Sequence, residues 1–182
     1  AGVRPGDRVA VVGCGGVGFC AEVAVTTDIA GAAGVLGAVT TSWLVVKKPD
    51  LSMMLNGAIA ALVAITAACA FVAPWAAIVI GLGAGVVVVL GVLLVERVGI
   101  DDPIGAVAAH GMSGVWGTLA LGFLAVPELA ERLETGQGGL LYGGGLGQLG
   151  TQALGLLAVG AFTFTASLGV LWLMDVTVGI RA

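Results

Sequence analysis

The sequence contains few charged residues. Asp, Glu, Lys and Arg make up 10% of its 182 residues, whereas hydrophobic residues make up 59% and the mean hydropathy is +1.13. An ordinary globular domain carries about 25% charged residues, which help to cover its surface. So low a charge content excludes an ordinary soluble domain and indicates an integral membrane protein, whose outer solvent is lipid.

Cysteine and basic residues are scarce as well. The three cysteines, Cys14, Cys20 and Cys69, form neither a CxxC pair nor a disulfide framework. The seven Lys and Arg residues are scattered and the net charge is −4, so we do not expect nucleic acid as a partner. The first residues lack the apolar core of a secretory signal peptide. We expect no metal site and no cofactor.

Long uncharged runs divide the chain. A bilayer-spanning helix needs about 20 mostly apolar residues. The runs predict five spans, at residues 22–46, 52–73, 75–98, 103–126 and 146–179. Pro74 and Trp75 mark the turn between the second and third spans, and the last span is long enough to be strongly tilted or to project from the membrane. The predicted fold class is an all-α polytopic membrane protein with about five transmembrane helices.

Basic residues indicate how these spans cross the membrane. Lys47 and Lys48 follow the first span, Arg97 follows the third and Arg181 follows the fifth, so all four share one side. The positive-inside rule places this side in the cytoplasm. We therefore expect a multi-pass protein of the cell membrane, with its N-terminus outside and its C-terminus in the cytoplasm.

Small residues recur at helical spacing within two of the spans. They are Gly81, Ala84 and Gly85 in the third span and Gly111, Gly114 and Gly117 in the fourth. Lipid offers little hydrophobic drive for helix association, so small residues favour it by letting backbones approach closely. We predict that these residues pack against neighbouring helices.

One motif places ionisable residues at and within a span. Asp101-Asp102-Pro103 predicts the start of the fourth helix, with an aspartate as its N-cap and Pro103 in its first turn. His110, the one histidine, then lies roughly 10 Å into the membrane, at about 1.5 Å per residue. An ionisable group at this depth usually faces a cavity or the bundle interior and marks an ion or proton path. The alternative is a neutral histidine bonded to a neighbouring helix, without a transport role.

The N-terminal stretch carries a motif of another kind. "DRVAVVGCGGVG" has the pattern of a short strand followed by Gly13-x-Gly15-x-x-Gly18, the dinucleotide fingerprint. A cofactor site also needs a second strand and an acidic residue about 20 residues further on, and the sequence provides neither. Residues 1–18, "AGVRPGDRVAVVGCGGVG", resemble the nucleotide-binding segment of zinc-dependent medium-chain alcohol dehydrogenases. We predict that residues 1–20 form a leader and not a working domain.

Three other stretches resemble a membrane-protein family. They are "DLSMMLNGAIAALVAITAACAFVAPWAAIVIGLGAGV", "ERVGIDDPIGAVAAHGMSGVWGTLALG" and "LLYGGGLGQLGTQALG". In order, spacing and loop length they resemble the C-terminal half of the ammonium transporter (Amt/Mep/Rh) family, and the resemblance covers residues 21–182. It implies that the predicted spans correspond to the last five of the family's eleven helices.

The resemblance also implies a function and its residues. Members are homotrimers that recruit ammonium, deprotonate it and conduct ammonia through one narrow pore per subunit, and they are not enzymes. His110 matches the second of two pore histidines and Ala106 matches a pore-lining apolar position. Asp102, beside Asp101 and Pro103, matches a structural aspartate at a helix start. The implied partners are ammonium or ammonia, the lipid bilayer and, for some members, a PII-type signal protein.

Several departures from the family pattern predict an incomplete copy. No residue here matches the first pore histidine or the outer cation-binding aromatic, so we expect the chain not to conduct alone. It ends without the regulatory cytoplasmic tail, so we do not expect the PII-type protein to bind it. Glu22 and Asp28 place charges in the first span, at about 2.5–3.5 kcal/mol each, and their role stays open. Two alternative functions remain: a non-conducting scaffold or partner subunit of a full-length relative, and an NAD(P)-dependent oxidoreductase fragment.

Overall fold

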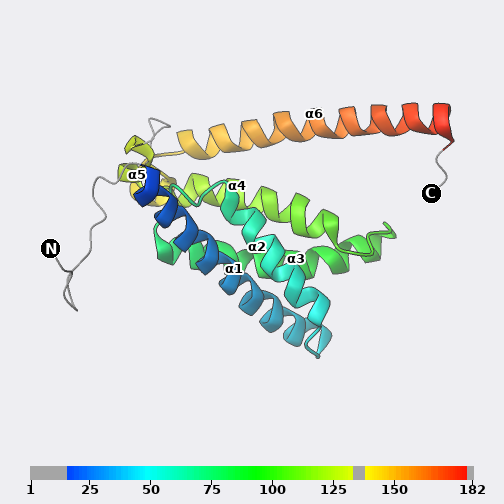
Figure 1. The fold of residues 1–182 in the computed structure, drawn as a ribbon, viewed down its shortest axis with the longest axis horizontal. Helices are drawn as coiled ribbons and strands as arrows, with labels where there is room; N and C mark the ends of the chain where they lie inside the picture. Colours follow the sequence, from blue (N-terminus) through cyan, green and yellow to red (C-terminus); the bar gives the residue numbers. More distant parts are fainter. Residues whose placement is uncertain (1–15, 133–137, 180–182) are drawn as a thin grey trace.

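The computed structural model describes residues 16–132 and 138–179. Within these ranges the chain is helical and contains no strand (Figure 1). Its helices are α1 (Gly16–Val46), α2 (Leu51–Thr66), α3 (Pro74–Val98), the π-helix η1 (Val107–Met112), α4 (Ser113–Leu124), α5 (Pro127–Arg132), the 3₁₀-helix η2 (Leu140–Tyr142) and α6 (Gly147–Val178). Four stretches are long and apolar enough to cross a membrane: Cys20–Val46, Pro74–Val98, Val107–Leu124 and Gly147–Val178. The all-α membrane fold is confirmed.

The second predicted span is shorter than the sequence indicates. α2 ends at Thr66 and turns follow at residues 67–72, so the expected continuation to residue 73 is wrong. Its 16 residues extend about 24 Å, less than the ~30 Å hydrocarbon core. The turns are stabilised from outside the helix. The Thr26 hydroxyl donates to the Cys69 carbonyl at 2.8 Å, and a backbone N–H donates to the Phe71 carbonyl at 2.8 Å.

α1 and α3 pack with their backbones in contact. A Cβ atom on Gly81 would meet the carbonyl group of Ala30, and one on Gly85 would lie 2.6 Å from the backbone nitrogen of Ala38. Ala84, on the same side of α3, is fully buried. The predicted packing role of these three α3 residues is confirmed, because the glycines leave no Cβ atom between the two backbones and Ala84 is buried in the same contact.

α2 packs in the same way against α1 and α4. A Cβ atom on Gly57 would lie 2.7 Å from the Gly34 carbonyl oxygen of α1. A Cβ atom on Gly117 of α4 would lie 2.5 Å from the Cα atom of Ala64. The core around these contacts consists largely of alanine, with Ile65, Ile80, Val88 and Val89 as its largest fully buried apolar side chains. Many short-range contacts between small groups therefore hold the bundle together.

α6 lies outside this bundle and runs along α4 (Figure 1). Its contact begins near Leu149, whose Cα atom lies 2.8 Å from a Cβ atom built on Gly122. Every described residue from Leu157 to Gly179 is exposed. The last predicted span, 146–179, agrees closely with the 32-residue α6, which is long enough to be tilted or to project.

The N-terminal part of α1 overlaps the predicted leader. α1 begins at Gly16, so Gly18 is helical and does not lie in a strand-to-helix turn. Gly13 and Gly15, with the predicted strand before them, lie outside the described residues. Asp28 is exposed on α1, as is Glu22.

The glycine contacts predict the effect of adding one methyl group. Gly117→Ala should lower the free energy of unfolding by about 1–3 kcal/mol, because the new Cβ atom meets the backbone of Ala64 and forces α4 away from α2. The measurement is reversible unfolding of the full chain in detergent, followed by circular dichroism.

Gly155→Ala is the matched control. No atom lies within 4 Å of a Cβ atom built at Gly155 of α6, so this substitution should be neutral or stabilising by about 0.5–1 kcal/mol through helix propensity. Equal effects of the two substitutions would contradict backbone contact at Gly117.

Candidate functional site

The predicted site begins at Asp102, which fixes the start of the helix that carries His110. The Asp102 carboxylate accepts hydrogen bonds from the backbone N–H groups of Ala106 at 2.8 Å and Val107 at 2.9 Å. Gly105, which lies directly before Ala106, has φ +70°, a left-handed conformation that glycine adopts without strain. The Asp102 side chain therefore caps the start of this helix, although the N-cap residue is Ala106 and not, as predicted, an aspartate.

Pro103 does not lie where the sequence predicts. It sits in a turn before the helix and not in the first helical turn, because the Asp102 carboxylate caps residues four and five positions further on. The Asn56 side-chain amide of α2 donates to the Ile104 carbonyl at 3.1 Å and ties this turn to the bundle. Asp101 is exposed, and among the described residues its side chain shows no hydrogen bond. The aspartate pair thus divides into one capping residue and one surface residue.

His110 lies on the outside of the described bundle. It is exposed, whereas the preceding Ala108 and Ala109 are buried against the other helices. Ala108 and Ala109 occupy the inner face of these helices, so the expectation that His110 faces a cavity or the bundle interior stays a prediction. Within the described residues its imidazole makes no hydrogen bond to a neighbouring helix, so the alternative of a bonded histidine is not seen either. Ala106, the half-buried N-cap residue of η1, lies one turn before it.

The histidine lies in a π-helix, which no pattern in the sequence predicted. Residues Val107–Met112 form this wider turn, and Ser113 closes it with a backbone N–H that donates to the Ala108 carbonyl, five residues back. π-turns are rare and occur frequently at functional sites. Gly111, immediately after the histidine, lowers the local preference for an α-helix and is a signal in the sequence that marks this place.

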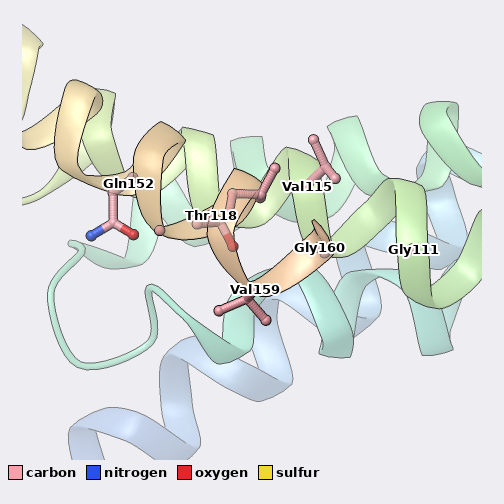
Figure 2. Close-up of a pocket in the computed structure, with 9 residues that line it drawn as sticks. Gly111, Val115, Thr118, Gln152, Val159 and Gly160 are labelled. Atoms are coloured by element: carbon pink, nitrogen blue, oxygen red, sulfur yellow. The ribbon is translucent and has the colours of Figure 1, made fainter. Parts of the chain in front are cut away.

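A groove runs beside this segment, between α4 and α6 (Figure 2). Its volume is about 480 Å³ and it is open to the outside. Its walls are glycines and aliphatic residues, and Figure 2 shows Thr118 and Gln152 bringing a hydroxyl and an amide group to it. The lining residues are Gly111, Gly114, Val115, Thr118, Gln152, Gly155, Leu156, Val159 and Gly160.

Two of the predicted packing glycines border this groove instead of a helix contact. A Cβ atom built at Gly111 would have no neighbour within 4 Å, and one at Gly114 would meet a single methyl carbon of Val63, at 3.8 Å. The packing prediction is therefore wrong for Gly111 and Gly114 and correct for Gly117. His110, Gly111 and Gly114 lie on exposed or partly exposed parts of the segment, while Ser113 and Gly117 are buried.

Comparisons with known proteins identify the kind of protein to which this arrangement belongs. A model of the Ammonium Transporter Family matches residues 13–182. The ammonium transporter Amt2 of Archaeoglobus fulgidus is 40% identical over 164 residues, which are 87% of this chain and 34% of the relative. The ammonium transporter of Mycobacterium tuberculosis is 36% identical over 183 residues, 99% of this chain and 37% of the relative.

The fold has the same relatives. The crystal structure of Candida albicans Mep2 superposes with a TM-score of 0.81 at 29% sequence identity, covering 90% of this chain and 37% of that chain. This chain therefore spans little more than a third of the length of these relatives. The family match includes Gly13, Gly15 and Gly18, the glycines of the dinucleotide pattern.

The two neighbouring aspartates provide a test of the cap. Asp102→Ala should lower the free energy of unfolding by about 0.5–2 kcal/mol, because the N–H groups of Ala106 and Val107 lose their acceptor. Asp101→Ala removes the same charge one residue away and should change it by less than about 0.5 kcal/mol. Equal losses in the two variants, in the same unfolding measurement, would show that charge and not capping matters here.

Proposed function

This chain belongs to the ammonium transporter family, and we propose that it forms part of a pathway that conducts ammonium or ammonia across a membrane. The observation that carries the proposal is His110, an exposed imidazole within an apolar helix whose opposite face packs against the bundle. An intramembrane ionisable residue of this kind commonly marks an ion or proton path.

The chemistry follows from the charge of the substrate. Ammonium carries a charge that is costly to place in hydrocarbon, whereas ammonia is neutral. In the proposed mechanism ammonium loses a proton before ammonia passes the apolar side chain of Ala106. The His110 imidazole accepts that proton and returns it. The chain has one histidine, so a second pore histidine of the kind found in the family would come from outside it.

The exposed face of the bundle that carries His110 indicates that the pathway needs further helices. His110 and the groove between α4 and α6 both lie at the surface of the described residues. We propose that helices corresponding to the unmatched part of the relatives cover this face and complete the pore. The family trimer belongs to the same proposal, with ammonium transport and not catalysis as the activity.

The proposed orientation has support from the helix directions. Ala30 faces Gly81 and Gly34 faces Gly85, so α1 and α3 run parallel and their C-terminal ends lie on one side. Lys47, Lys48 and Arg97 follow or end these helices. We propose that this side is cytoplasmic in the cell membrane.

The test uses methylammonium uptake in cells that lack other ammonium transporters. The chain is expressed alone, and also in place of the matched segment of the M. tuberculosis relative, with which it aligns over 99% of its length. Uptake by the chimera but not by the chain alone is the expected result. Absence of uptake by a correctly inserted chimera would favour the second candidate function, a non-conducting partner subunit.

His110→Ala should reduce uptake by the chimera at least about tenfold, because the group that exchanges the proton is lost. Val107→Ala is the matched control. It truncates an exposed side chain of the same π-turn and should leave uptake within about twofold of the unmodified chimera. Uptake that survives His110→Ala unchanged would overturn the assignment of the histidine.

A further inference from the structure

The π-turn that carries His110 is closed by one serine. Ser113 is fully buried, and its hydroxyl donates to the Ala108 carbonyl oxygen at 3.0 Å. Its backbone N–H donates to the same oxygen and also to the His110 carbonyl oxygen. Both donors of Ser113 therefore converge on an acceptor five residues back, which is the hydrogen-bond pattern of a π-turn.

The Ala108 carbonyl is also the acceptor that decides between two helix types. In an α-helix it would bond the N–H group of Met112, four residues on. In the π-turn it bonds Ser113 instead. In an α-helix a hydroxyl bonds the carbonyl three or four residues back, as the Thr41 hydroxyl does with Gly37. The Ser113 hydroxyl instead bonds the carbonyl five residues back, which is the acceptor that the π-turn uses, and so it favours the wider turn.

Contacts on both sides hold the turn in place. At its start the Asp102 carboxylate binds the N–H groups of the first residues. Beyond its end the Trp116 indole N–H donates to the Ile80 carbonyl of α3 at 3.0 Å. The turn itself packs against Gly91 of α3. A Cβ atom built on Gly91 would lie 2.9 Å from Ala108 Cβ and 2.7 Å from Met112 Sδ. His110 lies between two anchored segments.

We propose that Ser113 is a positioning residue: its hydroxyl holds the π-turn and thereby sets the direction of the His110 side chain. Conversion of the turn to an α-helix shifts the chain by one residue relative to α4, a rotation of about 100°. Because hydrogen bonds of Asp102 and Trp116 hold the chain before and after the turn, the rotation falls on the residues between them, which include His110. The consequence for conduction rests on the proposed function, whereas the orientation of His110 does not.

The single histidine makes the proposal directly measurable. The full chain is labelled with ¹⁵N,¹³C-histidine and placed in lipid nanodiscs, so that every histidine signal comes from His110. The readout is the relaxation of the imidazole carbons caused by a water-soluble gadolinium chelate, relative to that caused by a doxyl-labelled lipid. Ser113→Ala should change this ratio at least about twofold and move the imidazole chemical shifts, because the side chain turns toward another environment.

Ser42→Ala is the matched control. Ser42 is also fully buried, and its hydroxyl donates to a backbone carbonyl, that of Lys48, at the same distance of 3.0 Å. This variant should lose comparable stability and leave the His110 signals in place. Changes of equal size in both variants would show a general structural effect and overturn the proposal, as would an unchanged His110 ratio in Ser113→Ala.

Deletion of Gly111 provides the second variant. Removal of one residue converts a π-turn to an α-turn without moving the flanking segments, and no atom lies within 4 Å of a Cβ atom built at Gly111. The deletion should shift the His110 signals even if Ser113→Ala does not yield folded protein. Unshifted signals in the deletion variant would contradict the proposal. Neither measurement requires transport, so a failure of the proposed function is seen separately, in the uptake of the chimera.

Discussion

Close approach of helix backbones at small residues is the constraint on which the rest of this structure depends. Lipid tails are as apolar as the side chains they contact, so burial of apolar area alone does not drive helices together in a membrane. Gly81 and Gly85 against α1, and Gly117 against α2, replace that drive with short-range contacts between backbones. These glycines fix which faces of α3 and α4 lie against other helices. His110 lies on the exposed face of the η1–α4 segment.

The general fold could be predicted from the sequence because its signals are strong and local. Uncharged runs of sufficient length predicted the spans, and the final span agrees closely with α6. The early end of α2 could not be predicted in this way. No proline or charge interrupts residues 51–73, and the turns at residues 67–72 are stabilised by donors from Thr26 and Val126, which lie far away in the chain.

The site shows the same division between local and long-range causes. The cap at Asp102 follows from a few neighbouring residues, although Pro103 lies outside the helix that the aspartate caps. The exposure of His110 depends on which face of the segment meets α2 and α3, and spacing alone did not distinguish Gly111 and Gly114 from Gly117. The π-turn depends on the competition of two donors for one carbonyl, to which hydrophobic periodicity is insensitive.

The central claim is that the η1–α4 segment turns Ala109 and Ser113 to the bundle and His110 to a pathway. Single cysteines introduced at 109, 110, 113 and 114 of the chimera, with Cys14, Cys20 and Cys69 replaced, test this most directly through their reaction with a water-soluble thiol reagent. The account predicts fast reaction for His110→Cys and Gly114→Cys and protection for Ala109→Cys and Ser113→Cys. Reaction at 109 and 113 with protection at 110 would contradict it.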